Sequence, residues 1–397
     1  MSAAPTPAAS DVLSAAAVRR AADRAYGAAE AGSLRHLALD RSRFEAVAEV
    51  IAEETRRNYP DLRVPYHSRW RHFEVGGVDR VGALGARLPN DSAERCRAKI
   101  GLATLSVLLD AGAGAAWRYC EPSTGRRHAR SEGLAVASFD FVMSGALSRT
   151  QGRPWRIETA PLAFVEDAEI ARAFQVGPDN PMVGLEGRAR LIRAAGDVLW
   201  NVGLGELGAV RDRIVERAEG KRLAAPAILE TLLRLFNAIW PGRLKAEGLN
   251  LGDAWRHPDL GLVPFHKLSQ WLSYSLIEPL AEEGFEIVDL DGLTGLPEYR
   301  NGGLLIDLGL IRPKAGAWPD EALAVDHPLI VEWRALTVAL LDRLAPRVRE
   351  RLGLDAKFFP LAAMLQGGSW SAGRRIARDL RADGRPPLRV VSDGTVF

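Results

Sequence analysis

Residues 328–341 read PLIVEWRALTVALL, and this stretch decides the fold class. Pro328 suits the first turn of a helix, which we expect to run to about Leu344. A helix that is apolar nearly all the way round lies in a core. Glu332 and Arg334 interrupt the apolar surface, and an unpaired buried charge costs several kcal/mol. Each side chain should therefore contact an opposite charge or bind a ligand. The pattern alone does not distinguish a structural ion pair from a residue that binds a ligand.

Helical spacing of apolar residues continues on both sides of this stretch. It predicts a helix from the N-cap Asp40 to just before Tyr59, with a second clear stripe after Pro226. Further helices are predicted over residues 136–147, 167–174, 185–202, 204–218 and 265–283. The best strand pair of the first half is a hairpin around Gly125, while residues 284–309 indicate a loop with at most one short strand. The sequence thus predicts a mainly α protein with a small β-hairpin and a few short strands.

Composition narrows the class of protein. The chain has 397 residues, 47% of them hydrophobic and 26% charged, which is enough for a full core. A net charge of +2 from 52 basic and 50 acidic residues disfavours binding to a nucleic-acid polymer. The apolar run 100–109 stops at Asp110, short of a membrane span. We expect a cytoplasmic protein that binds a small molecule. Residues 1–31 should form a flexible N-terminal arm or a weak helix, and an extended tail should follow Pro386.

The usual cofactor signatures are missing from the sequence. There is no phosphate-binding glycine loop, no dinucleotide motif, and no Cys-x-x-Cys or His-Glu-x-x-His spacing. A Gly-x-Ser-x-Gly nucleophile elbow is also missing. We therefore expect neither a cofactor nor a metal.

Two polar clusters occur where the apolar pattern places the chain inside. On a helix, His266, Gln270 and Ser273 stack at spacings of four and three. This stripe indicates either a solvent-facing surface or the wall of a cleft. In the loop LPEYRNGG at 296–303, Glu298 and its neighbours offer an acceptor, a guanidinium and an amide. That loop could aim a carboxylate into a cavity or form a surface turn. Weaker clusters at residues 70–72 and 366–374 are more typical of turns.

Several long strings of unusual composition resemble the uracil-catabolism family of fungi and bacteria, a former domain of unknown function. They are YHSRWRHF at 66–73, LDAGAG at 109–114, RSEGLA at 130–135, PFHKLSQW at 264–271, LPEYRNGG at 296–303, VEWRALT at 331–337 and SDGTVF at 392–397. The resemblance covers the chain from about residue 35. It implies a protein that acts after the pyrimidine ring has been opened, on a ribosylurea intermediate.

A more distant resemblance sharpens the expected reaction. The order of elements from Gly184 to Leu310 is similar to that of the queuosine-salvage N-glycosylases, whose helical fold is related to DNA glycosylases. Their loop carries Asp-Tyr-Arg and a later Gln, whereas this chain has Glu298-Tyr299-Arg300 and lacks that Gln. The resemblance implies a glycosylase-like domain over residues 32–319, with residues 320–397 as a helical extension packed on it.

These resemblances imply an N-glycosyl hydrolase that cleaves ribosylurea, or its 5-phosphate, to urea and the sugar. Positive charge develops on the sugar C1 carbon, so a carboxylate must lie beside it. Glu298 is the first candidate for this carboxylate, followed by Glu332 and Asp307. The expected substrate-binding residues are Gln270 and Asn301 for urea, then Arg71, His72, His266, Lys267 and Arg300 for a phosphate, together with Tyr299 and Arg334. Two alternatives remain, a non-catalytic protein that binds the intermediate or a nucleotide, and an amidohydrolase acting on a ring-opened ureide.

Overall fold

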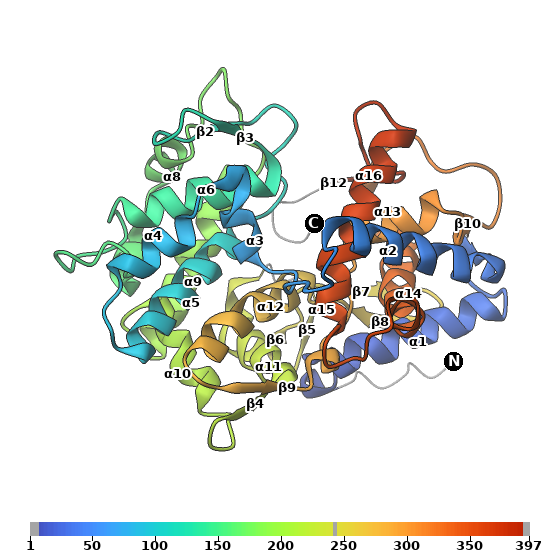
Figure 1. Ribbon diagram of the computed structural model, residues 1–397, viewed down its shortest axis with the longest axis horizontal. Coiled ribbons are helices and arrows are strands. Elements are labelled where there is room, and N and C mark those ends of the chain that lie inside the picture. Colours follow the sequence, from blue (N-terminus) through green and yellow to red (C-terminus); the bar gives the residue numbers. More distant parts are fainter. Residues whose placement is uncertain (1–7, 241–243, 392–397) are drawn as a thin grey trace. The chain divides into compact units, whose positions relative to one another are not determined.

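The computed structural model describes residues 8–240 and 244–391, and it is mainly helical, as the sequence predicts (Figure 1). The strands in this part of the chain are two to four residues long, and each pairs with one partner strand. The chain forms two compact units, and each is built from separate stretches of sequence. None of the helices within the described ranges has the length and apolar character needed to cross a membrane.

Unit 1 comprises residues 8–67, 244–270 and 289–391. Its longer helices are α1 (Ala15–Glu30), α2 (Phe44–Asn58), α13 (Tyr299–Asp307), α14 (Pro328–Leu352) and α16 (Trp370–Leu380). Its shorter elements are η1 (Ala9–Asp11), η2 (Arg41–Arg43), η6 (Leu290–Gly292), α15 (Leu361–Met364) and the π-helical turn η7 (Leu365–Ser369). Its strand pairs are β1 (Leu37–Leu39) with β10 (Ile311–Pro313), β5 (Lys245–Ala246) with β6 (Leu249–Asn250), β7 (Ala254–His257) with β8 (Gly261–Pro264), and the parallel β11 (Leu323–Ala324) with β12 (Val390–Val391).

Unit 2 comprises residues 68–240 and 271–288. Its helices are α3 (Arg69–Phe73), η3 (Val75–Gly77), α4 (Arg80–Arg87), α5 (Ser92–Leu108), α6 (Arg130–Met143), α7 (Thr159–Phe164), α8 (Asp167–Ala173), α9 (Leu185–Asn201), η4 (Leu207–Ala209), α10 (Val210–Val215), α11 (Ala225–Leu235) and η5 (Asn237–Ile239). Its strand pairs are the antiparallel β2 (Tyr119–Cys120) with β3 (Arg127–His128) and the parallel β4 (Arg222–Ala224) with β9 (Glu286–Val288). The helix α12 (Lys267–Glu282) begins in unit 1 and continues in unit 2.

The helix α14 is the centre of unit 1, and every residue from Leu329 to Leu341 is buried. This confirms the prediction made from its apolar circumference. The helix α1 packs along it, and the buried residues of α1 include small side chains such as Ala21 and Ala25. The sequence suggested a flexible arm or a weak helix in residues 1–31, and Ala15–Glu30 is a packed helix, because its small alanine side chains allow close approach. Residues 1–7 of that arm lie outside the described residues.

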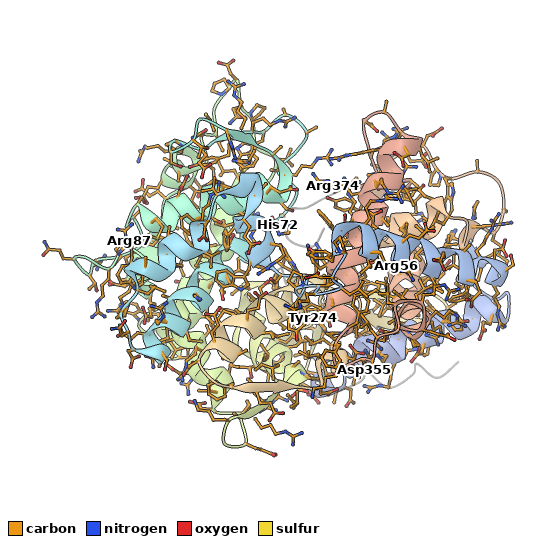
Figure 2. All side chains as sticks on the ribbon, viewed as in Figure 1. Arg56, His72, Arg87, Tyr274, Asp355 and Arg374 are labelled. Atoms are coloured by element: carbon orange, nitrogen blue, oxygen red, sulfur yellow. The ribbon has the colours of Figure 1, made fainter. Side chains whose placement is uncertain are left out.

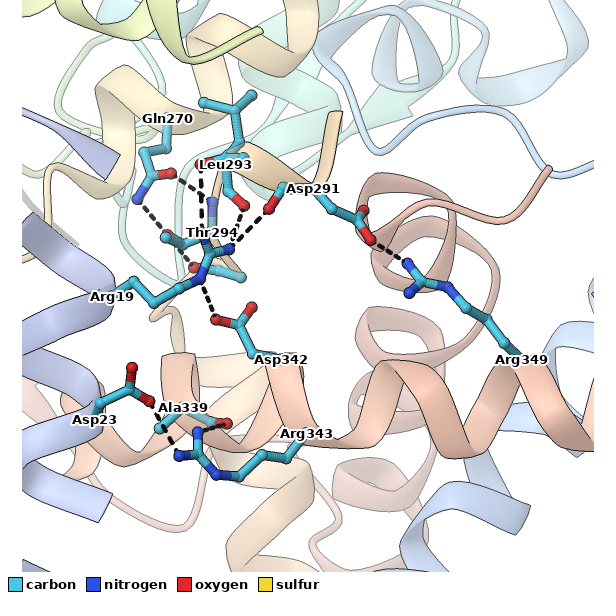
Figure 3. Close-up of polar contacts among 12 residues, drawn as sticks. Arg19, Asp23, Gln270, Asp291, Leu293, Thr294, Ala339, Asp342, Arg343 and Arg349 are labelled. Atoms are coloured by element: carbon cyan, nitrogen blue, oxygen red, sulfur yellow. Dashed lines mark hydrogen bonds and ion pairs between the residues drawn. The ribbon is translucent and has the colours of Figure 1, made fainter. Parts of the chain in front are cut away.

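Polar contacts reinforce the packing of α1 on α14 (Figure 3). Arg19 Nε donates to Asp342 Oδ2 at 2.8 Å, and the same guanidinium donates to the backbone carbonyls of Asp291 and Leu293. On the opposite side of the same loop, Arg349 pairs with the Asp291 carboxylate at 2.5 Å. The segment that leads into Glu298 is therefore fixed by arginines from two helices.

Most of the predicted helices and the hairpin are present. The stripe of α2 is confirmed, since Phe44, Val47 and Ile51 are all buried. The predicted loop over residues 284–309 is wrong in part, because Tyr299–Asp307 is the helix α13. Gly302 is typical of a loop in sequence. In the structure a side chain at this position would collide with the Trp333 indole, so the glycine allows α13 and α14 to pack closely. In the tail, β12 is the extended segment, and residues 392–397 lie outside the described residues. The division at residues 31 and 319 stays a prediction.

Candidate functional site

Glu298 caps the N-terminus of α13 with its side chain. Its Oε2 accepts a hydrogen bond from the backbone N–H of Arg300 at 2.7 Å, and its Oε1 accepts one from the N–H of Asn301. The residue is only 7% exposed, so its carboxylate lies inside the protein and is not part of a surface turn. A carboxylate oxygen can accept more than one hydrogen bond. The cap therefore fixes the orientation of the group and leaves lone pairs for a water or a substrate.

The pKa of Glu298 is raised by its burial, while the two backbone hydrogen bonds and the nearby positive charges of Lys267 and Arg300 oppose this shift. A carboxylate with a raised pKa is a stronger base than an exposed one. Strongly shifted groups next to a specific charge are common in active sites. The environment of Glu298 thus suits a group that accepts a proton or stabilises a cation.

His67 lies near the same lysine, in a setting that keeps it neutral. Burial, aided by the charge of Lys267 and opposed by the hydrogen bond with Gln366, lowers the pKa of His67 to about 4. His67 Nδ1 lies 3.0 Å from Gln366 Oε1, and Gln366 Nε2 donates to the Tyr59 hydroxyl at 3.3 Å. The His67 and Trp370 rings lie 5.8 Å apart. We call Glu298, Lys267, His67, Gln366 and Trp370 the Glu298 cluster.

A buried ion pair fixes the segment that precedes Glu298 in the sequence. The two terminal guanidinium nitrogens of Arg334, Nη1 and Nη2, donate to the Asp253 carboxylate at 2.8 and 2.7 Å. Burial by itself raises the pKa of Asp253, but the charge and hydrogen bonds of Arg334 lower it to about 2. The Nε of Arg334 reaches the carbonyl of Pro297 at 3.4 Å, and Asp253 also accepts from the backbone N–H of Lys267 at 3.1 Å. This ion pair therefore positions the segments that carry Glu298 and Lys267. It also gives Arg334 an opposite charge, as the sequence analysis predicted for a buried arginine.

Two amides expected to bind urea also hold the loop in place. Gln270 Oε1 accepts from the Thr294 N–H at 2.9 Å, and its Nε2 donates to the Thr294 hydroxyl (Figure 3). The same Nε2 also donates to the carbonyl of Phe265. Asn301 Nδ2 donates to the carbonyl of Leu296 at 3.2 Å, and its Oδ1 accepts from the Ser369 hydroxyl at 2.8 Å. The polar stripe is buried, and Gln270 within it has no exposed surface.

The other two candidate carboxylates are occupied by partners elsewhere in unit 1. Glu332 accepts hydrogen bonds from the backbone N–H groups of Arg35, His36 and Leu37 at 2.9 to 3.4 Å, and His257 Nε2 lies 3.3 Å away. Asp307 accepts two hydrogen bonds from Arg381, at 2.9 and 2.6 Å. Glu332 thus joins α14 to the segment before β1, and Asp307 joins α13 to the end of α16.

The structure separates the residues expected to bind a phosphate. His266 precedes α12 with a positive φ of 49°, so it leaves the predicted helix face, and its Nε2 lies 2.9 Å from the Val12 carbonyl. Arg300 donates to the carbonyl of Gly384 at 2.9 Å, and its guanidinium lies 5.0 Å from the Tyr299 ring centroid. Within unit 1, only Lys267 of this set belongs to the Glu298 cluster.

Arg71 and His72 belong to unit 2, and His72 is labelled in Figure 2. Arg71 pairs with Glu278 at 2.7 Å, and the His72 ring meets the Trp271 ring edge to face at 5.6 Å. The segment 69–73 that contains them is the short helix α3, whereas the sequence analysis favoured a turn at residues 70–72. Their predicted role in binding stays a prediction.

The sequence analysis did not select His67, Gln366, Trp370 or Asp253 as site residues. The first three lie in or beside the strings of unusual composition at 66–73 and 366–374, where aromatic and polar residues gather without an apolar period. That composition was the available signal. No sequence pattern pointed to Asp253, because its contact with Arg334 depends on the tertiary structure. Among the residues that the structure describes, no group of three or more His, Cys, Asp or Glu side chains could hold a metal ion.

The chain is similar to known proteins over nearly its whole length. A family model described as "Protein of unknown function (DUF1688)" matches residues 11–397. "Protein urg3" of Schizosaccharomyces pombe is 38% identical over 400 residues, covering 97% of this chain and 98% of that protein. "Uracil catabolism protein 4" of Lachancea kluyveri is 36% identical over 414 residues, covering 92% of this chain and 93% of that protein.

Proposed function

Because this chain belongs to the DUF1688 family and a full-length relative is named for uracil catabolism, we propose that it acts in uracil catabolism as an N-glycosyl hydrolase. The substrate is ribosylurea or its 5-phosphate, and the products are urea and the free sugar. Water adds to the C1 carbon of the sugar, the bond from C1 to the urea nitrogen breaks, and that nitrogen gains a proton. The overall reaction consumes one water and needs no oxidant or reductant.

The observation that carries this proposal is the buried, oriented carboxylate of Glu298. Cleavage of a glycosidic bond develops positive charge at C1, and a fixed carboxylate beside C1 stabilises that charge. Two backbone N–H groups fix Glu298, and burial raises its pKa, so it can also take the proton of the attacking water. Glu332 and Asp307 are less suitable because their oxygens already bind the backbone of residues 35–37 or Arg381.

The leaving group needs hydrogen bonds because urea departs with negative charge on nitrogen and oxygen. Lys267 is half-buried, and its charge acts on Glu298. We assign Lys267 to the urea oxygen, where an ammonium group stabilises the developing charge. Tyr299 follows Glu298 directly and is also half-buried, so we assign it to the rim of the sugar site.

The proposal is tested by incubating the purified protein with ribosylurea and with ribosylurea 5-phosphate and measuring the urea released. We expect release from at least one of them. The variant Glu298→Gln should lose about 10²-fold or more in kcat, as is usual when a catalytic acid or base is removed. Asp307→Asn is the matched control, since it changes another buried carboxylate of α13 and should keep its activity.

Three outcomes separate the alternatives. Binding of the substrate without urea release from either form would favour a non-catalytic binding protein. Loss of activity on treatment with a chelator, with recovery on adding a metal, would favour a ureide amidohydrolase, which usually needs a metal. Full activity in Glu298→Gln would contradict the assignment of Glu298.

A further inference from the structure

Large apolar side chains are exposed along the helix α9 of unit 2. Phe164 is 74% exposed and Trp200 is 65% exposed, and Val183 and Val202 are also exposed. Trp200 lies in the last turn of α9, the two valines lie just outside its two ends, and Phe164 ends the neighbouring helix α7. Exposed apolar side chains that gather in one place commonly mark a contact with another molecule.

The helices α7 and α9 pack closely, and their contacts place Phe164 beside the middle of α9. A side chain at Gly196 would collide with the backbone of Ala163. Arg193 Nη1 donates to the carbonyl of Val165 at 3.0 Å. Phe164 lies between Ala163 and Val165 in sequence, so it lies beside the segment of α9 from Arg193 to Gly196.

The exposed face of α9 carries four charged residues. Glu186, Arg190, Arg193 and Asp197 follow one another at spacings of four, three and four, which places them along one face of the helix. Arg193 pairs with Asp167 at 2.6 Å, and Arg190 pairs with Glu186 at 3.5 Å. Asp197 is exposed and makes no hydrogen bond or ion pair with residues 8–240 or 244–391.

The order of these charges is complementary to its own reverse. Arg190 and Asp197 are two helical turns apart, and the midpoint between them falls between residues 193 and 194. A second copy of α9 that lies antiparallel to the first, with a twofold axis through this midpoint, brings Arg190 of each copy to Asp197 of the other. Phe164 of each copy then lies near the axis, and the Trp200 end of each α9 faces the Val183 end of the other.

We propose that α7 and α9 form the interface of a homodimer, in which two copies of this chain pack these helices against each other in antiparallel order. The face fits a second copy because its charges are complementary to themselves. Phe164 and Trp200 supply the apolar contacts, and a few such aromatic residues commonly carry most of the binding energy. The exposed pair of Arg190 with Glu186 contributes little, so Arg190 can bind Asp197 of the other copy instead.

Sedimentation velocity on the full-length protein, at concentrations from about 1 to 100 µM, measures the mass of the particle. We expect the mass of two chains. Trp200→Asp and Phe164→Asp should each raise the dissociation constant of the dimer by about 100-fold or more, since each residue acts twice in a symmetric interface. Phe358→Asp changes a similarly exposed phenylalanine of unit 1 and should stay a dimer.

Charge reversal tests the antiparallel pairing. Arg190→Glu and Asp197→Arg each bring like charges together at both pairs, so each should weaken the dimer by about 10-fold or more. An equimolar mixture of these two variants forms two attractive pairs again and should dimerise about as tightly as the original protein does. Rescue of each variant by the other cannot result from a loss of folding.

Three results would overturn the proposal. The first is the mass of a single chain for the original protein over the whole concentration range. The second is a dimer that both Trp200→Asp and Phe164→Asp leave intact. The third is a mixture of Arg190→Glu and Asp197→Arg that dimerises no more tightly than either variant alone. If the original protein has the mass of a single chain and binds phosphatidylcholine vesicles through Trp200, the face belongs to a lipid surface instead.

Discussion

Glu298 and Glu332 are buried carboxylates of the same unit, yet they are held by different kinds of partner. Glu332 has no exposed surface and binds three backbone N–H groups of residues 35–37, nearly 300 positions away in sequence. Glu298 is 7% exposed and binds two N–H groups within its own helix. A carboxylate that binds partners far away in sequence holds two segments together, as Glu332 does. A carboxylate that binds only neighbouring N–H groups, as Glu298 does, is oriented by them but does not connect distant segments.

The same contrast applies to the charges around the two residues. Glu332 lies 3.3 Å from His257, whose pKa is lowered by burial. Glu298 has Lys267 nearby, a half-buried residue on a different segment. A buried group whose hydrogen bonds are all made inside the protein has little capacity left for a substrate. The comparison therefore predicts that mutation of Glu332 acts on stability and mutation of Glu298 acts on catalysis.

The largest expected effect is on the stability of Glu332→Ala. The substitution leaves the N–H groups of residues 35–37 without their acceptor, and that of Leu37 is buried. A hydrogen bond to a charged group contributes about 1.5–3 kcal/mol, so we expect the loss of all three to cost about 3–5 kcal/mol. Urea unfolding followed by circular dichroism measures this loss. Glu53→Ala, on the exposed surface of α2, is the control and should change stability by less than about 0.5 kcal/mol. A small effect of Glu332→Ala would remove the distinction between the two carboxylates.

Glu298→Gln should have the largest effect on catalysis. A loss of about 10²-fold in kcat corresponds to about 2.7 kcal/mol of transition-state stabilisation. Glutamine keeps the shape of the side chain and one acceptor for the helix cap, so the loss of stability should stay below about 2 kcal/mol. Steady-state urea release and urea unfolding on the same preparation give both numbers. A variant that loses stability and activity in the same proportion would indicate a purely structural cap.

The pH dependence of stability gives a smaller, signed test of Glu298. Because its pKa is raised above the ordinary value of 4.5, the folded state holds its proton more tightly than the unfolded state does. The unfolding free energy of the original protein should therefore fall, relative to Glu298→Gln, as the pH rises from about 4.5 through the raised pKa, and then level off. Unfolding of both proteins across this range measures the difference. A difference that stays constant with pH would contradict the raised pKa.

Local patterns in the sequence predicted much of the fold but fewer of the contacts at the site. The burial of Glu332 and Arg334 followed from the apolar circumference of residues 328–341, since periodicity reports burial directly. The helix α13 was missed because Gly302 and Gly303 mark turns in most contexts, and only the approach of Trp333 explains a glycine at 302. The partner of Arg334 could not be predicted, because Asp253 is 81 residues away.

The candidate site shows the same limit. Glu298 was selected from the sequence on its loop chemistry, which fitted both a surface turn and an inward-facing carboxylate, and the structure buries it. His67 and Trp370 were not, since each string alone is typical of a turn, and their meeting across about 300 residues depends on tertiary structure. His266 was placed on the wrong face because its positive φ ends the helical pattern one residue before α12 begins.

Asp307 allows the finest division between a structural and a catalytic carboxylate. It lies on α13 with Glu298, but Arg381 binds both of its oxygens, and the Arg381 side chain is 19% exposed. Asp307→Asn keeps one acceptor oxygen and removes one charge of a partly solvated pair, so it should cost only about 1 kcal/mol of stability. Its kcat for urea release should equal that of the original protein within about twofold. If Asp307→Asn instead lost about 10²-fold in kcat while Glu298→Gln stayed active, the catalytic carboxylate would lie at the far end of α13, and Arg381 would be its positioning residue.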